Sequence, residues 1–309
     1  MKAIVYKSTG SWYTVKDMDG RWYNARIKGV FKIDEDITST NPIAVGDEVE
    51  IALEDESENV AVITDILPRR NYINRQSPRL KHQQHIIAAN LDQSLLLATL
   101  REPRTSQGFI DRFLVVCEMY HVPAVILFNK TDLYRKKEEE QLDRLSTMYK
   151  SLGYPVYPVS VEENRNMDFL KELLHDKTTL ISGHSGVGKS SLINSLLGMQ
   201  IKTRDVSGWS GKGMHTTTFA TMYDLPEGGV IIDTPGIREL AITTDLDKHE
   251  LSHYFPEMRQ RLHQCRYNNC LHVNEPDCAI KQAVLDGEIY EERFISYLNI
   301  LESLREKEY

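Results

Sequence analysis

The sequence predicts a multi-domain chain with a small N-terminal β-barrel, a central α/β domain built on a doubly wound sheet, and a C-terminal, mainly α-helical module. Three observations predict this division. Short β-forming runs alternate with turn residues up to about residue 68, buried strand-like runs alternate with helical runs from residue 86, and cysteine and histidine residues gather after residue 260. We therefore expect domains at 1–68, 69–240 and 241–309.

The N-terminal part contains five runs that we expect to form strands, at 2–7, 12–16, 21–27, 48–53 and 61–67. Five short strands favour an OB-like barrel, a fold that often binds oligonucleotides, and an SH3-like barrel is the alternative. Four aromatic residues either stack on bases or fill and flank the barrel core. They are Trp12, Tyr13, Trp22 and Tyr23.

The composition is that of an ordinary globular protein, with 41% hydrophobic and 27% charged residues among 309. No apolar run approaches the roughly 20 residues that cross a bilayer, and the N-terminus lacks a signal-peptide cleavage pattern, so we expect a cytoplasmic protein without membrane association. The net charge of −8 argues against a globally basic nucleic-acid binder. The stretch from Arg69 to His85, however, is basic and holds no Asp or Glu, so it is either a solvated linker or a strip that contacts phosphates.

A glycine-rich segment, Gly183 to Ser190, follows a predicted strand at 178–181 and precedes a predicted helix, which is the context of a phosphate-binding loop. Its backbone N–H groups can hold the β- and γ-phosphates of a nucleotide, Lys189 adds a positive charge there, and the Ser190 hydroxyl can bind Mg²⁺. The nucleotide-binding residues predicted in this segment are Gly183, His184, Ser185, Gly186, Val187, Gly188, Lys189, Ser190 and Ser191.

A second phosphate signature is Asp233-Thr234-Pro235-Gly236, which follows another buried strand. We expect Asp233 to hold Mg²⁺ through water and the N–H of Gly236 to bind the γ-phosphate.

The base-recognition signature is Asn129-Lys130-Thr131-Asp132. The Asp132 carboxylate can accept hydrogen bonds from N1–H and from the 2-amino group of guanine, and adenine lacks that amino group. We expect Asn129 to bond the opposite edge of the base, the Lys130 stem to lie over the ring, and Ser160 to offer backbone contacts to guanine O6. In ordinary GTPases this loop comes after the phosphate loop, whereas here it comes before it, so the sequence predicts a circularly permuted P-loop GTPase domain.

Catalysis cannot follow the usual glutamine route, because Ile237 stands directly after the Asp233–Gly236 loop. The segment 202–218 supplies the candidates instead. We expect Thr216 or Thr217 to close over Mg²⁺, and we favour Thr217. His215 either orients and deprotonates the attacking water or is an exposed loop histidine. The predicted catalytic residues are therefore His215, Lys189 and Thr217, with slow hydrolysis that rises when a partner orders this segment.

The C-terminal cluster consists of Cys265, Cys270, His272 and Cys278. Three thiolates and one imidazole make a closed tetrahedral set that is typical of one structural zinc ion. His253 and His263 are alternatives for the histidine ligand. The fourth cysteine, Cys117, is interpreted as a small buried hydrophobic residue.

Together these features resemble the ribosome small-subunit-dependent GTPase A family. Segments 90–93, 110–112 and 213–218 are similar to that family as well. The resemblance implies Mg²⁺-dependent GTP hydrolysis that the small ribosomal subunit stimulates, a role in late maturation of that subunit, contacts with its rRNA, a monomeric state and a catalytic His215. Two alternatives remain: a permuted GTPase acting on another RNA–protein target, and a non-hydrolysing, GTP-dependent RNA-binding protein.

The permuted order also suggests a way to transmit nucleotide state. The loop at Asp233–Gly236 runs almost directly into the zinc module, so its movement on hydrolysis can pass to that module without a long linker.

Overall fold

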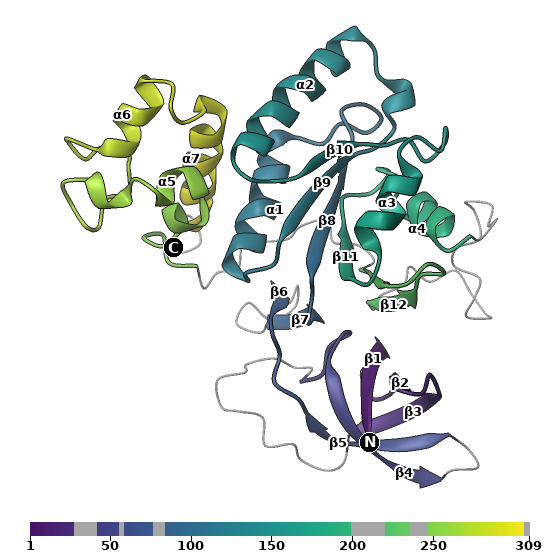
Figure 1. The fold of residues 1–309 in the computed structure, drawn as a ribbon. Coiled ribbons are helices and arrows are strands. Elements are labelled where there is room, and N and C mark those ends of the chain that lie inside the picture. The colour runs from purple at the N-terminus through teal and green to yellow at the C-terminus, as the bar shows by residue number, and fades with distance from the viewer. Residues whose placement is uncertain (28–41, 56–58, 77–83, 199–219, 235–245, 306–309) are drawn as a thin grey trace.

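The computed structural model describes residues 1–27, 42–55, 59–76, 84–198, 220–234 and 246–305. Figure 1 shows a barrel at the N-terminus, a central layered α/β domain, and a C-terminal helical module beside α1. Among the described residues no helix combines the length and the apolar character needed to cross a membrane.

The N-terminal domain is a five-stranded barrel within the described residues, as predicted. The order β1–β2–β3–β5–β4 closes because β4 pairs back onto β1, and β3 and β5 run parallel. Tyr13 and Tyr23 are buried in its core, whereas Trp12 and Trp22 are exposed. One side of the Trp22 ring system is occupied, since Tyr6 lies edge to face with it at 4.7 Å and the Lys16 ammonium lies 5.2 Å from it. The strands are β1 (Lys2–Ser8), β2 (Tyr13–Asp17), β3 (Trp22–Ile27), β4 (Glu48–Asp55) and β5 (Val60–Ile66).

The central domain confirms the predicted doubly wound sheet. Its strands lie in the order β10–β9–β8–β11–β13–β12, and all neighbours except β12 are parallel. They are β8 (Gln93–Ala98), β9 (Ala124–Phe128), β10 (Val156–Pro158), β11 (Thr178–Ser182), β12 (Thr221–Asp224) and β13 (Val230–Asp233). Strand β1 of the barrel pairs with β12, so the two domains share one continuous sheet.

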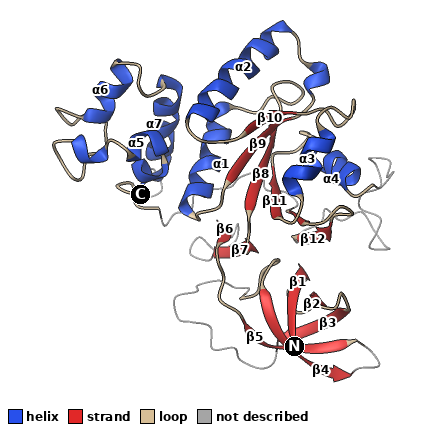
Figure 2. Ribbon diagram, in the orientation of Figure 1, coloured by secondary structure: helices blue, strands red, loops and turns tan. Residues whose placement is uncertain are grey.

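Helices cover both faces of this sheet, as Figure 2 shows. Successive side chains of a strand point to opposite faces, so Leu96 and Ala98 of β8 pack in the core under α1 and α2, and Leu95 and Leu97 pack in the core under α3 and α4. The helices are α1 (Gln107–Met119), the short 3₁₀ helix η1 (Thr131–Leu133), α2 (Lys136–Ser151), α3 (Met167–Leu174) and α4 (Lys189–Leu196).

The C-terminal module is helical and docks on α1. Apolar residues of α7, among them Tyr297 and Leu301, belong to the same core as Ile110 and Phe113 of α1, so the module has no core separate from that of the central domain. Its elements are η2 (Leu251–Tyr254), α5 (Pro256–Arg259), η3 (Leu262–Gln264), α6 (Ala279–Leu285) and α7 (Glu291–Arg305).

The basic stretch after the barrel forms a hairpin that we did not predict, with β6 (Tyr72–Gln76) paired to β7 (Gln84–Ala89). The first two arginines of the basic stretch, Arg69 and Arg70, pair with carboxylates of the protein itself. The Arg69 guanidinium donates two hydrogen bonds to the buried Asp47 carboxylate, at 2.6 and 2.7 Å. Arg70 forms an ion pair with Asp92 at 2.8 Å. The Asn90 amide nitrogen adds a further contact with the barrel by donating to the Gly46 carbonyl oxygen at 2.9 Å. The barrel is thereby fixed against the central sheet.

Candidate nucleotide site and metal centre

The phosphate loop joins β11 to α4 and presses against two neighbouring strand ends. A Cβ at Gly183 would lie 2.5 Å from the Leu97 carbonyl oxygen at the end of β8. A Cβ at Gly188, whose φ is +99°, would lie 2.5 Å from the Asn129 amide nitrogen. Both glycines are therefore required by close approach, and the second requirement comes from the base-recognition loop.

Lys189 wraps back over the loop. Its ammonium donates to the Gly183 carbonyl oxygen and, at 2.9 Å, to the His184 carbonyl oxygen. Burial lowers the pKa of Lys189, and the charge of Asp233 opposes that shift. Burial likewise raises the pKa of Asp233, and Lys189 opposes it. Each of the two charges thus stabilises the other against the effect of burial. Ser190, the residue after Lys189, is exposed.

Asp233 lies at the carboxyl end of β13, directly beside Ile181 of β11. Thr234, the next residue, is buried, and its hydroxyl oxygen has no hydrogen-bond partner among the described residues. The predicted magnesium residues Ser190 and Asp233 are therefore at the same edge of the sheet. Gly236, His215, Thr216 and Thr217 lie outside the described residues.

The base-recognition loop follows β9 and is fastened to the phosphate loop. Asn129 is buried, and its amide nitrogen donates to the Val187 carbonyl oxygen at 2.9 Å. The Thr131 hydroxyl donates to the Val159 carbonyl oxygen at 3.0 Å, and the Lys130 ammonium donates to the Glu102 carbonyl oxygen at 2.5 Å. The Asn129 amide nitrogen therefore joins the two loops, and the contact with the base that we expected of Asn129 stays a prediction.

The Ser160 side chain bonds the Asp132 carboxylate. Its buried hydroxyl donates to Asp132 Oδ1 at 2.5 Å and accepts the Glu163 N–H at 3.1 Å. Its backbone N–H and carbonyl are both bonded to Arg165, at 3.2 and 2.8 Å. Both backbone groups of Ser160 are therefore bonded to Arg165, and its hydroxyl orients the Asp132 carboxylate. The expected backbone contact with guanine O6 stays a prediction. No sequence pattern pointed to Arg165, because its bonds to Ser160 are made through the backbone.

The four predicted zinc ligands converge in the C-terminal module. Their ligand atoms all lie within 4.8 Å of one another, and within the described part of the chain the cluster includes neither His253 nor His263. The His272 Nδ1 atom lies 3.3 Å from the Cys278 sulfur and 3.7 Å from the Cys265 sulfur. A tetrahedral zinc ion with ordinary bond lengths has nitrogen–sulfur edges of about 3.6 Å, so the donor set fits zinc.

Burial shapes the protonation of this cluster when no metal is bound. It raises the pKa of Cys270 to about 12 and lowers the pKa of His272 to about 4. Burial also raises the pKa of Cys278, so the buried thiols and the imidazole favour their neutral forms. Zinc binding would have to release the thiol protons.

The fold and the site together define a class. A guanine-type recognition loop precedes the phosphate loop in the chain, yet both meet at the carboxyl ends of parallel strands of one sheet. This is the arrangement of a circularly permuted GTPase.

Comparison with known proteins identifies the family. Residues 66–243 match the model of the RsgA GTPase family, and residues 2–62 match the model of the RsgA N-terminal domain. The chain belongs to the RsgA GTPase family.

Curated relatives match over their full length. A Bacteroides fragilis protein named small ribosomal subunit biogenesis GTPase RsgA is 48% identical over 310 residues, covering 100% of this chain and 99% of the relative. A Cytophaga hutchinsonii protein of the same name is 50% identical over 302 residues, covering 97% of this chain and 98% of the relative.

Solved structures agree in fold. The crystal structure of YjeQ from Thermotoga maritima superposes with a TM-score of 0.78 at 33% identity, covering 98% of each chain. That of YloQ, described as a circularly permuted GTPase, gives 0.75 at 27% identity and covers 99% of this chain and 95% of the other.

Proposed function

We propose that this chain hydrolyses GTP under stimulation by the small ribosomal subunit and acts in late maturation of that subunit. One observation carries the proposal: Asn129 bonds the Val187 carbonyl oxygen at 2.9 Å and so joins two nucleotide loops that are permuted in the chain. The relatives named small ribosomal subunit biogenesis GTPases share this chain from end to end, which supports the choice of target.

The residues at the sheet edge fit GTP with magnesium. Lys189 would neutralise the β- and γ-phosphates, and Ser190, Asp233 and Thr217 would hold the metal. The N–H of Gly236 would bind the γ-phosphate; Thr217 and Gly236 lie outside the described residues. Magnesium supplies charge neutralisation at the transferring phosphate when it is bound. Asp132, held by Ser160, would select guanine. His215 is proposed to orient the attacking water, because Ile237 cannot.

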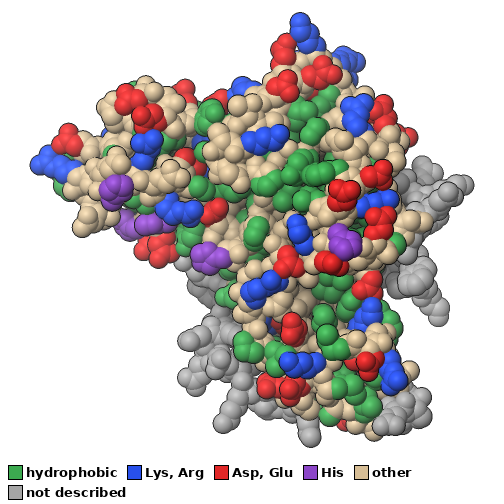
Figure 3. Space-filling view, in the orientation of Figure 1, with side chains coloured by type: hydrophobic (Ala, Val, Ile, Leu, Met, Phe, Trp, Pro, Cys, Tyr) green, Lys and Arg blue, Asp and Glu red, His purple; other side chains and the backbone are tan. Residues whose placement is uncertain are grey.

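The flanking domains fit a role on RNA. The barrel presents Trp12 and Trp22 at its surface, with 47% and 46% of each residue exposed, and such rings can stack on unpaired bases. On the face seen in Figure 3, Lys and Arg side chains are interspersed with Asp and Glu, so binding there would depend on local contacts rather than on a basic field. We propose one structural zinc in the C-terminal module, a monomeric state and a cytoplasmic location. We keep domain boundaries near residues 68 and 240.

Single-turnover phosphate release tests the proposal. Pre-bound GTP should be hydrolysed slowly by the free protein and much faster with small subunits, and isolated large subunits should have little effect. Lys189→Ala should abolish both rates, and His215→Ala should lower the stimulated rate without changing GTP affinity.

Equal stimulation by the large subunit would favour another RNA–protein target. No release under any condition, with GTP still bound tightly, would favour the non-hydrolysing alternative. Either result would overturn the proposal.

A further inference from the structure

Helix α1 lies between the phosphate loop and the C-terminal module and contacts both. Phe109 in its first turn meets the ring of His184 in the phosphate loop, and Asp111 in its second turn is bonded to the module. Phe109 and Asp111 are two residues apart, so the two contacts lie only about 3 Å apart along the helix axis.

In the contact between α1 and the phosphate loop, both ring nitrogens of His184 have polar neighbours. His184 Nδ1 lies 3.1 Å from the Ser185 carbonyl oxygen, which only accepts, so Nδ1 carries the proton. The other ring nitrogen, Nε2, lies 2.7 Å from the Thr105 hydroxyl oxygen, within hydrogen-bond distance. The oxygen of that hydroxyl in turn accepts the Thr99 N–H at 2.9 Å. The Phe109 ring meets the His184 ring edge to face at 5.5 Å, so the imidazole is held by its polar atoms and its edge.

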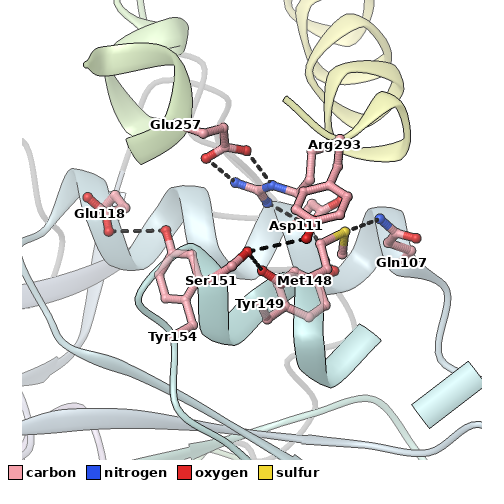
Figure 4. Close-up of polar contacts among 10 residues, drawn as sticks. Gln107, Asp111, Glu118, Met148, Tyr149, Ser151, Tyr154, Glu257 and Arg293 are labelled. Atoms are coloured by element: carbon pink, nitrogen blue, oxygen red, sulfur yellow. Dashed lines mark hydrogen bonds and ion pairs between the residues drawn. The ribbon is translucent and has the colours of Figure 1, made fainter. Parts of the chain in front are cut away.

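The contact with the module is a buried ionic cluster, drawn in Figure 4. Asp111 Oδ1 accepts from Arg293 at 2.7 Å and from the Tyr149 hydroxyl at 2.8 Å. Arg293 also donates to Glu257 at 2.7 and 3.3 Å, and its guanidinium lies over the Phe255 ring at 4.6 Å. Arg293 is 1% exposed and Asp111 0% exposed, so water cannot take over these bonds if α1 shifts.

A buried ionic cluster of this kind does not tolerate a partial displacement of α1 from the C-terminal module. A buried guanidinium and two buried carboxylates are strongly destabilised when their geometry is lost, so the helix and the module must move together or separate. Because His184 belongs to the phosphate loop, any change in that loop acts on the same short stretch of α1.

We propose that His184 is a positioning residue that couples occupancy of the phosphate loop, through α1, to docking of the C-terminal module. Coupling of this kind is reciprocal, so nucleotide strengthens docking and docking strengthens nucleotide binding by the same factor. This route consists wholly of described residues, unlike a route through the Asp233–Gly236 loop.

Hydrogen exchange of α7 in the full-length protein, with and without saturating GDP, tests the first direction. GDP should slow exchange in α7 by at least about fivefold in the native protein. His184→Ala should lose this slowing at full GDP occupancy, and Thr105→Val should reduce it. The matched control is His175→Ala, because His175 is a surface histidine of the same domain that pairs with Asp176. The control should respond as the native protein does.

A double-mutant cycle tests the reverse direction. A neutral cluster, Arg293→Met with Asp111→Asn and Glu257→Gln, should weaken GDP about fivefold when residue 184 is histidine and less than about twofold when it is alanine. Zinc content and helical signal confirm that each variant is folded.

Equal weakening in both backgrounds, or an α7 response to GDP that survives His184→Ala, overturns the coupling. The inference rests on nucleotide binding at this site alone. Because it uses GDP without subunits, its failure is distinguishable from failure of the proposed hydrolysis.

Discussion

At the scale of single residues, the nucleotide site is organised by side chains that bond across its loops. Asn129 is the clearest case, because its amide nitrogen both bonds Val187 and lies where a Cβ at Gly188 would stand. The glycine and the asparagine are therefore matched to each other. The bond joins two loops that are 58 residues apart in the chain.

Ser160→Ala should weaken GDP binding about fivefold to thirtyfold while keeping the preference for guanine, because it removes the hydroxyl that orients Asp132 and leaves the carboxylate in place. Fluorescent GDP titration measures the change. An affinity equal to that of the native protein would show that Asp132 needs no support.

Asp132→Asn is the contrasting change at the same contact. It should relax the choice between guanine and other purines rather than simply lower affinity, since the amide presents a donor where the base also donates. Competition of GDP with ADP and with xanthosine diphosphate distinguishes the two effects. A ratio unchanged from the native protein would contradict the role given to Asp132.

The sequence predicted at this scale the residues whose chemistry is tied to a fixed spacing. The phosphate-loop lysine and the four clustered metal ligands lie in the predicted environments, because each motif is short and local. It did not predict that the Ser160 hydroxyl supports Asp132 or that Arg69 forks onto Asp47, because those partners are 28 and 22 residues away. Spacing alone cannot show such contacts.

At the scale of elements, the barrel is joined to β12. This strand lies between two segments outside the described residues, 199–219 and 235–245. Strand β12 begins directly after residues 199–219 and leads through a turn into β13, which ends at Asp233. Asp224 at the end of β12 accepts from the Tyr6 hydroxyl at 2.6 Å and from Lys16 at 2.7 Å. Burial, and then Asp224, raise the pKa of Tyr6, so the phenol stays a donor.

Asp224→Asn should therefore lower the free energy of unfolding by about 1–2 kcal/mol, most of it through the bond from buried Tyr6, because the Lys16 pair is partly exposed. Urea denaturation measures this. The matched control is Glu54→Gln, which breaks an exposed pair with Arg26 on the barrel and should cost less than about 0.5 kcal/mol. Equal costs for the two variants would remove the special role of Asp224.

The cluster on α1 allows a sharper test of an element interface. Arg293→Met should destabilise the protein by about 3–5 kcal/mol, because Asp111 and Glu257 would stay buried without their cation. Adding Asp111→Asn and Glu257→Gln should restore more than half of the loss, since neutral amides cost less to bury. Thermal unfolding compares the variants. If the triple variant is no more stable than Arg293→Met alone, lost packing rather than stranded charge explains the cost.

At the scale of the whole molecule, the flanking domains attach to different elements of the central domain. The barrel extends the sheet at β12, and the C-terminal module shares the core of α1. Figure 1 shows this module beside α1. The layers of the central domain followed from the hydrophobic periodicity of the sequence, which is a local property of the chain. The docking of the module did not, because α7 meets α1 about 190 residues earlier in the chain, as in the Arg112–Ser303 bond. The permutation therefore brings a C-terminal module onto a helix that precedes the phosphate loop.

Removal of zinc should reveal how far the module depends on its metal. The three cluster cysteines hold residues from the end of η3 to the start of α6, and this segment has little apolar core of its own. Chelation should therefore unfold the module, while the central sheet continues to bind GDP with an affinity reduced by no more than the coupling through α1 allows.

Thiol labelling makes the expected result unambiguous, because the chain carries an internal control. Cys117 is buried in α1, and burial raises its pKa, so it should stay unreactive with or without zinc. Cys265, Cys270 and Cys278 should react only after chelation, together with release of about one zinc per chain. Reaction of these three before chelation, or of Cys117 alongside them, would mean either that zinc does not hold the module or that the central domain unfolds with it.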